Sequence, residues 1–292
     1  VSTQSTGVSL QKIGYSPVSQ VFYGTNKLTA QPVAIKIYNF TQNNTQHILR
    51  EVSIMTRLNH ENLIKFYNYF ESADQSAIIQ DLAKQELIEI IASQRYYCED
   101  DCRQYILQIL NGLKYLHQYN VPHNNLKPSN ILFSKTVKLC DYNLNDLVPE
   151  EFRLASPGFT APEQLLGVNT KKSDVYSVGI ITHLLLTGKI PFSDELNQLL
   201  EEQFNDQLQI QKNAISQNAI DFISQACKYD YKDRCDLEEL LTHKWLNEPV
   251  PVIPLSNTQL QLKKYQAGLT LKNGCSIKMV DLNKLTQKWK VE

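Results

Sequence analysis

Residues 123–130 decide the interpretation of this chain, and they read His123-Asn124-Asn125-Leu126-Lys127-Pro128-Ser129-Asn130. A pair of asparagines is followed, after Leu126, by a lysine directly before Pro128 and an asparagine two residues after it. One short stretch of this kind carries little weight by itself. Its meaning depends on which other patterns stand before and after it, and in which order.

Two patterns precede this stretch. The apolar run Val33-Ala34-Ile35 leads into Lys36 and is typical of a buried strand. Between residues 47 and 58, apolar side chains recur near helical spacing, at Ile48, Val52, Met55 and Leu58. This spacing predicts an amphipathic helix, with Glu51 outside the buried stripe.

Further patterns follow it. The run Leu139-Cys140-Asp141-Tyr142-Asn143 carries a carboxylate after apolar residues, and Ala161-Pro162-Glu163 is typical of a helix start. Farther along stand Ser173-Asp174-Val175-Tyr176-Ser177-Val178-Gly179 and then Arg234. Strand patterns therefore come first in the chain, and mainly helical patterns come after them.

In this order, the patterns resemble those of the protein kinase superfamily, of the serine/threonine type, over most of the chain. The resemblance implies an α+β, bilobal protein-kinase fold. A small β-rich N-lobe with one main helix is expected over about residues 8–80, and a larger, mostly α-helical C-lobe over about 84–248. The kinase-like domain is thus predicted to span residues 1–248. The resemblance also implies a structural pair between Glu163 and Arg234.

The same resemblance implies a nucleotide site. Lys36 is expected to hold the phosphates and to pair with Glu51, and Asn130 and Asp141 are the implied magnesium ligands. The remaining residues implied to surround the adenine are Val21, Ala34, Gln80, Leu82, Ala83 and Leu132. ATP and magnesium are therefore the candidate cofactors, with weak or absent binding as the alternative.

The departures from the family pattern concentrate on the chemistry. Asn125 stands at the position of the catalytic base, and its amide has no useful basicity, whereas base assistance contributes about 10²–10⁴-fold in rate. The loop expected to be rich in glycine keeps only the first of three, and Pro17 at its tip has no N–H. Asn124 replaces an arginine that pairs with a phosphorylated activation loop, and Asn143 replaces a glycine. Lys127 is retained.

These departures predict a catalytically impaired, kinase-like protein. On this interpretation the chain is a pseudokinase and not an enzyme, acts as a scaffold or allosteric protein-binding module, and still has the residues for ATP. One alternative is a slow serine/threonine kinase, favoured by Lys127 and by both metal ligands. Another is a structural component of a larger assembly, for example a cytoskeletal one, with no nucleotide bound.

Composition restricts the partners. The net charge is −1 and the pI about 6.7, which gives no electrostatic basis for binding nucleic acid or an anionic membrane. The six cysteines lack metal-binding spacing and indicate reduced thiols. The apolar run 175–186 is too short to span a bilayer. We therefore expect a cytoplasmic protein, with the cytoskeleton as a candidate location, that binds other proteins; its oligomeric state is not predicted.

A tail of different composition follows the predicted domain. Pro249, Pro251 and Pro254 mark a linker that opens the segment 249–292. Apolar and polar residues alternate around an Asn-Gly pair between Leu269 and Met279, which predicts a β-hairpin. Packing of this arm on its own domain and packing on a partner are both compatible with the sequence.

Overall fold

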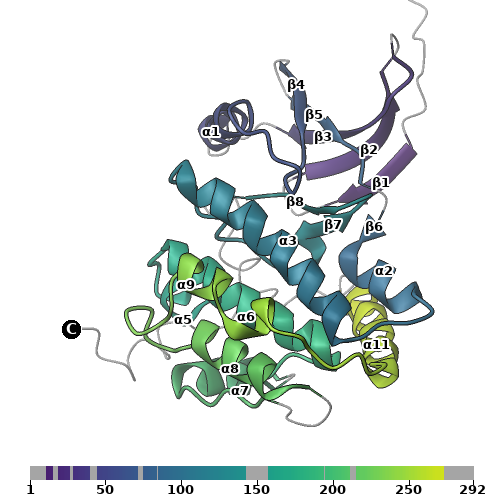
Figure 1. Ribbon diagram of the computed structural model, residues 1–292. Coiled ribbons are helices and arrows are strands. Elements are labelled where there is room, and N and C mark those ends of the chain that lie inside the picture. The colour runs from purple at the N-terminus through teal and green to yellow at the C-terminus, as the bar shows by residue number, and fades with distance from the viewer. Residues whose placement is uncertain are drawn as a thin grey trace, which may run out of the picture.

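The chain forms two lobes, with a sheet-rich lobe standing on a helical one (Figure 1). The computed structural model describes residues 11–15, 19–26, 29–39, 45–71, 75–83, 85–142, 157–193, 195–210 and 215–272. The α+β bilobal architecture predicted from the sequence is confirmed.

A single antiparallel sheet forms the N-lobe, in the order β1-β2-β3-β5-β4. Its strands are β1 (Gln11–Tyr15), β2 (Ser19–Thr25), β3 (Pro32–Asn39), β4 (Phe66–Glu71) and β5 (Gln75–Asp81). The register sets Ala34 opposite Gln80, and Lys36 opposite both Val21 and Ile78. Because side chains opposite each other in such a ladder lie on the same face, the register alone brings these residues to one side of the sheet.

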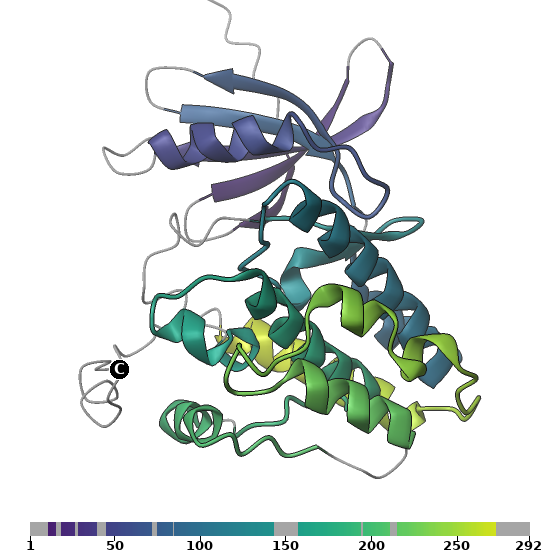
Figure 2. The same cartoon turned by 60° about the vertical axis from the view of Figure 1, so that its left-hand side comes forward.

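Helix α1 (Thr45–Met55) lies across this sheet, as the turned view makes plain (Figure 2). Ile48, Val52 and Met55 are buried, as the spacing predicted. Glu51 is also buried, with 6% of its surface exposed, so its predicted place outside the buried stripe is wrong. The carboxylate turns inward because it accepts a hydrogen bond from Tyr38 Oη at 2.9 Å, which compensates part of the cost of burying it.

Helices make up most of the C-lobe. They are α2 (Leu87–Ser93), α3 (Glu99–Gln118), α5 (Pro162–Leu165), α6 (Lys171–Thr187), α7 (Leu196–Phe204), α8 (Gln217–Ala226), α9 (Leu237–Leu241), α10 (Lys244–Asn247) and α11 (Ser256–Lys272), with 3₁₀ turns at Pro128–Asn130 and Pro157–Phe159. Helix α6 is buried along nearly all of its length and packs on α3 and α8. In the described part of the chain, no helix is long and apolar enough to cross a membrane.

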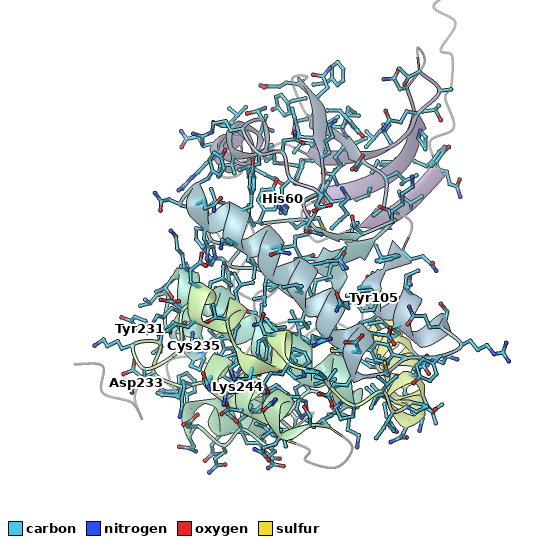
Figure 3. The ribbon with its side chains drawn as sticks, in the orientation of Figure 1. His60, Tyr105, Tyr231, Asp233, Cys235 and Lys244 are labelled. Atoms are coloured by element: carbon cyan, nitrogen blue, oxygen red, sulfur yellow. The ribbon has the colours of Figure 1, made fainter. Side chains whose placement is uncertain are left out.

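A small sheet joins the lobes, in the order β6-β7-β8. Its strands are β6 (Gln85–Glu86), β7 (Ile131–Phe133) and β8 (Val137–Leu139). A further contact is the stacking of His60 on Tyr115 of α3, with ring centroids 4.9 Å apart. Figure 3 shows His60 at this boundary between the lobes.

The predicted hairpin is wrong over the part of it that the structure describes. Residues 269–272 belong to α11, which packs on α2 and α6, and the rest of the predicted hairpin lies outside the described residues. The helix forms because Leu262 is fully buried and Thr258 Oγ1 donates to the carbonyl of Leu186 at 2.7 Å. These contacts with distant residues override a local alternating pattern.

Candidate functional site

The loop of residues 123–130 follows α3, and a residue of α6 holds its first two positions. The carboxylate of Asp174 accepts hydrogen bonds from the backbone N–H of His123 at 2.8 Å and of Asn124 at 2.7 Å. It also lies 2.7 Å from His117 Nε2. Asn124 adopts the left-handed region, with φ of 59°, which asparagine tolerates better than most residues. The loop is therefore held by one buried carboxylate.

Three charged side chains meet between the lobes. Lys36 Nζ lies 2.7 Å from Asp141 and 3.9 Å from Glu51. Burial by itself would lower the pKa of Lys36, but the neighbouring acidic groups, Asp141 first, raise it well above its usual value. Burial raises the pKa of Glu51. The predicted pairing of Lys36 with Glu51 is present, and Asp141 is the nearer partner.

Asn130 and Asp141 lie on either side of the β7–β8 hairpin, whose register sets Ile131 opposite Leu139. The side-chain Nδ2 of Asn130 donates to the backbone carbonyl of Asn125 at 2.7 Å. The backbone N–H of Cys140 donates to the backbone carbonyl of Asn130 at 3.1 Å. The Asn130 side-chain oxygen and the Asp141 carboxylate are thus available as metal ligands, and oxygen is the ligand atom that magnesium prefers. The residues present therefore fit a magnesium ion.

Asn125, at the position of the catalytic base, uses its side-chain amide for a hydrogen bond to the backbone. Its Nδ2 donates to the backbone carbonyl of Asp141 at 3.3 Å. The side chain of Lys127, two positions farther along the loop, is half-buried. Burial lowers the pKa of Lys127, against the opposing charge of Asp141. A half-buried cation thus lies within electrostatic range of Asp141, two positions after Asn125 in the chain.

The residues predicted to hold the adenine surround the same region. Ala34 is buried and Val21 half-buried, both on the face of the N-lobe sheet that carries Lys36. Leu82 and Ala83 follow β5 and are half-buried, and Leu132 lies in β7 of the joining sheet. These residues come from both lobes and from the connection between them. Their roles are inferred from the resemblance.

The resemblance to kinases also implies an apolar column of Met55, Phe66, His123 and Tyr142 that couples the lobes. Plain packing of the core is the alternative interpretation of these four residues. The rings of His123 and Tyr142 are in edge contact, with centroids 6.1 Å apart. Burial lowers the pKa of His123, and its Nε2 has no hydrogen-bond partner among the described residues. Pro17 and Asn143, at which the sequence departs from the family pattern, lie outside those residues.

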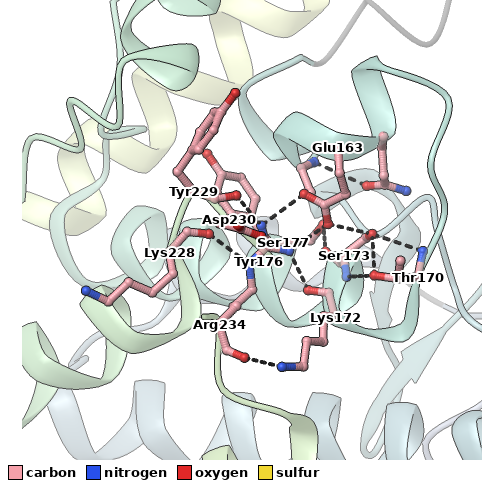
Figure 4. Close-up of polar contacts among 12 residues, drawn as sticks. Glu163, Thr170, Lys172, Ser173, Tyr176, Ser177, Lys228, Tyr229, Asp230 and Arg234 are labelled. Atoms are coloured by element: carbon pink, nitrogen blue, oxygen red, sulfur yellow. Dashed lines mark hydrogen bonds and ion pairs between the residues drawn. The ribbon is translucent and has the colours of Figure 1, made fainter. Parts of the chain in front are cut away.

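Below the site, the predicted pair of Glu163 and Arg234 is present (Figure 4). Arg234 Nη1 and Nη2 donate to the two carboxylate oxygens at 2.7 and 2.9 Å. The same guanidinium donates to the carbonyls of Lys172, Lys228 and Tyr229. Ser173 Oγ also donates to Glu163 at 2.8 Å. This buried network joins α5, α6 and the segment before α9.

Residues 8–246 match the model of the protein kinase domain family. The chain belongs to the protein kinase family. This kinase domain is 30% identical to calcium-dependent protein kinase 5 of Plasmodium falciparum over 252 residues, which cover 81% of the chain and 44% of the relative. It is 29% identical over 279 residues to calcium/calmodulin-dependent protein kinase type IV of Mus musculus, covering 89% of the chain and 59% of the relative.

A probable myosin light chain kinase of Dictyostelium discoideum is 28% identical over 274 residues, which cover 87% of the chain and 88% of that relative. The chain thus spans less than half of the Plasmodium relative's length. All three relatives are named as protein kinases. The prediction that this chain is not an enzyme is therefore wrong, because its relatives point to a kinase despite the asparagine at the base position.

The sequence missed two residues that shape the site. Tyr38 holds Glu51, and its place two residues after Lys36 on a strand, hence on the same face, is a signal that was available. Asp174 anchors the stretch at 123–124 across 50 intervening positions. No local pattern in the sequence could have indicated that pairing.

Proposed function

We propose that this kinase domain is a slow serine/threonine protein kinase that transfers the terminal phosphoryl group of ATP to a protein hydroxyl. The observation that carries the proposal is the meeting of Lys36, Glu51 and Asp141 between the lobes. Relatives named as protein kinases support it. The loop from Leu126 to Asn130 resembles the serine/threonine type and favours a hydroxyl on serine or threonine.

The retained residues suit a reaction that depends mainly on positioning and charge. Phosphoryl transfer passes through a loose transition state, so the protein supplies little covalent chemistry. Lys36 would bind the phosphates, held in place by Glu51, while Asn130 and Asp141 would hold the magnesium. Magnesium, when bound, offsets the negative charge that spreads over the phosphate oxygens. Lys127 is a further cation near the transferred group.

The destination of the hydroxyl proton distinguishes this site from a kinase site with an aspartate at the position of Asn125. As the bond between the terminal phosphorus and ADP breaks, the new bond to the substrate oxygen forms, and the proton passes to a phosphoryl oxygen or to water. Asn125 can orient the hydroxyl but cannot take up this proton. Losing base assistance costs about 10²–10⁴-fold in rate, so we expect the kinase to be slow.

Transfer of labelled phosphate from MgATP to a panel of serine and threonine peptides tests the proposal. The two variants are Lys36→Met, which removes the lysine expected to bind the phosphates, and the control Lys65→Met, which changes an exposed lysine of the same lobe. Transfer by the wild type and by Lys65→Met, lost in Lys36→Met purified in the same way, supports the proposal. Equal transfer by all three would identify a contaminating kinase. No transfer at near-stoichiometric protein would contradict the proposal.

Nucleotide binding is measured separately, by thermal unfolding with ATP in magnesium and in EDTA. A ligand at 100 times its Kd stabilises the folded state by about 2.7 kcal/mol. We expect this shift to require both magnesium and Lys36.

Finally, we propose residues 1–248 as the catalytic unit, with the segment 249–292 as an appendage whose helix α11 lies on the C-lobe.

A further inference from the structure

Gln164, the third residue of α5, connects segments that lie far apart in the chain. Its side-chain Nε2 donates to the backbone carbonyl of Asn124 at 3.1 Å and to Oδ1 of Asn169 at 3.3 Å. Its Oε1 accepts a hydrogen bond from the backbone N–H of Ala161 at 3.2 Å. A glutamine amide has two N–H donors and one acceptor oxygen. Both donors and the oxygen are therefore in use, and the reverse orientation of the amide would lose all three hydrogen bonds.

The helix that carries Gln164 is firmly anchored. The preceding residue, Glu163, is buried and accepts hydrogen bonds from both Nη atoms of Arg234 and from Ser173 Oγ (Figure 4). The hydrogen bond from Ala161 N–H to the Gln164 side chain caps the start of the helix. Because α5 is fixed in this way, a hydrogen bond from Gln164 to another segment restrains that segment as well.

The segment that receives this hydrogen bond has an unfavourable backbone. Asn124 has φ of 59°, in the left-handed region, which is costly for any residue with a Cβ. Residues in such conformations persist only where the surrounding structure over-determines them. Asp174 holds the backbone N–H of Asn124 at 2.7 Å, and Gln164 holds its carbonyl. Both backbone polar groups of Asn124 are thus bound by side chains from other elements.

This restraint passes directly to Asn125, at the position of the catalytic base. The carbonyl of Asn124 belongs to the planar peptide unit that joins it to Asn125. A hydrogen bond to this carbonyl therefore fixes the plane from which the Asn125 side chain projects. Since phosphoryl transfer depends mainly on positioning, the direction of this side chain decides how a hydroxyl approaches the phosphate.

We propose that Gln164 is a positioning residue of this kinase, which acts through the Asn124 carbonyl to orient Asn125 toward the substrate hydroxyl. The inference deepens the proposed function and rests on it, because it requires phosphoryl transfer at this site. A misplacement of about 1 Å at the reacting groups can lower a rate about 10²-fold. Gln164 is one of several restraints on the loop, so its loss should lower kcat by less, about tenfold.

Two variants separate this role from the capping of α5. Gln164→Met removes all three hydrogen bonds and keeps the length of the side chain. Gln164→Glu keeps an oxygen for the N–H of Ala161 but has no N–H to donate to the carbonyl of Asn124. The control is Gln225→Met, the same change at a half-buried glutamine of α8 whose amide donates to Asp221 of the same helix.

The rates of serine and threonine peptide phosphorylation by these proteins test the proposal. We expect kcat to fall about tenfold in both Gln164 variants and to stay at the wild-type value in Gln225→Met. The KM for MgATP should stay within about twofold of the wild type, because the residues proposed to hold the nucleotide are unchanged. A fall in kcat with an equal change in this KM would indicate general distortion of the site and would overturn the inference.

The glutamate variant distinguishes the remaining outcomes. Wild-type kcat in Gln164→Glu would also overturn the inference, because capping of α5 would then account for the residue. No transfer by the wild type would instead overturn the proposed function, so the two failures are distinguishable.

Hydrogen exchange without nucleotide gives an independent measurement. Amide protons of residues 123–126 exchange when this loop opens locally, and α6 provides the reference for global stability. Loss of one hydrogen bond should make exchange of the loop about twofold to tenfold faster in both Gln164 variants, and Gln225→Met should match the wild type. Wild-type exchange in both Gln164 variants would overturn the inference, whether or not the wild type transfers phosphate.

Discussion

The ammonium of Lys36 lies 2.7 Å from the carboxylate of Asp141, a residue 105 positions away in the sequence. A nucleotide that uses Lys36 for its phosphates must compete with this carboxylate. If Asp141 held magnesium as proposed, the ion would offset the charge of this carboxylate. We therefore expect nucleotide affinity to depend on the metal.

Asp141→Asn removes this competition together with a metal ligand. In EDTA we expect the variant to bind ATP at least about threefold more tightly than the wild type, because Lys36 is released and a repelling charge is lost. In magnesium the variant should gain no affinity over EDTA. Calorimetry or thermal shift in both buffers checks this, with the exposed Glu238→Gln as control. Weaker binding by Asp141→Asn in EDTA would disagree with the pairing.

Replacing Asn125 by aspartate, the residue expected at the catalytic-base position, should restore little kinase activity. Asn125→Asp loses the donation from Nδ2 to the carbonyl of Asp141 and sets a carboxylate against that acceptor. Pro17 and the missing glycines are unchanged. We expect a rise in peptide phosphorylation of less than about tenfold, although base assistance can contribute about 10²–10⁴-fold. A hundredfold rise in initial rate would show that Asn125 alone limits the enzyme.

The buried pair of Glu163 and Arg234 should be essential for stability. Arg234→Lys keeps the charge but loses the forked geometry that contacts both carboxylate oxygens and several carbonyls. Disrupting a buried ion pair typically costs about 3–5 kcal/mol, and we expect a loss at the lower end of that range. Urea unfolding measures it. Lys114→Met, which removes an exposed pair with Glu238, should change stability by less than about 1 kcal/mol.

Gly188 is required for the seating of α11. It ends α6 with φ of 77°, and a Cβ there would lie 2.3 Å from Gln261 Cβ and 2.8 Å from the carbonyl oxygen of Thr258. Gly188→Ala should therefore destabilise the C-lobe and expose residues 256–272 to hydrogen exchange. Gly167→Ala is a matched control, since its φ is 84° but no atom lies within 4 Å. Equal exchange in the two variants would mean that backbone strain alone, about 1–2 kcal/mol, explains the effect.

Stability should fall in acid partly through His183. Burial lowers the pKa of His183 to about 4, against a backbone hydrogen bond to Lys189 that opposes the shift. The unfolded chain, with a histidine pKa of about 6.5, therefore binds more protons than the folded chain between these values. The resulting stabilisation is fully present above about pH 6.5 and is lost as the pH falls toward 4, by about 3 kcal/mol in total.

His183→Asn isolates this contribution, because the asparagine amide can replace the Nδ1–H donor but does not titrate. Urea unfolding of both proteins at several pH values from 7 to 4.5 gives the two slopes. The wild type should lose more stability than the variant over this range. Parallel slopes would assign the acid sensitivity to other groups, such as His123, whose pKa burial also lowers.

Much of the fold could be predicted from local patterns. The strand that carries Lys36 and the helix with Ile48, Val52 and Met55 follow from the spacing of apolar residues, which depends only on near neighbours. The order of the motifs also indicated the pairs of Lys36 with Glu51 and of Glu163 with Arg234.

Only the tertiary structure decided which partners the polar groups find. Asp141 is nearer to Lys36 than Glu51 is, and Tyr38 donates a hydrogen bond to the buried carboxylate of Glu51. The segment ending at Lys272 is helical because α2 and α6 offer it a surface on which to pack. Such outcomes depend on contacts between residues far apart in the chain, and the periodicity of a short segment carries no information about them.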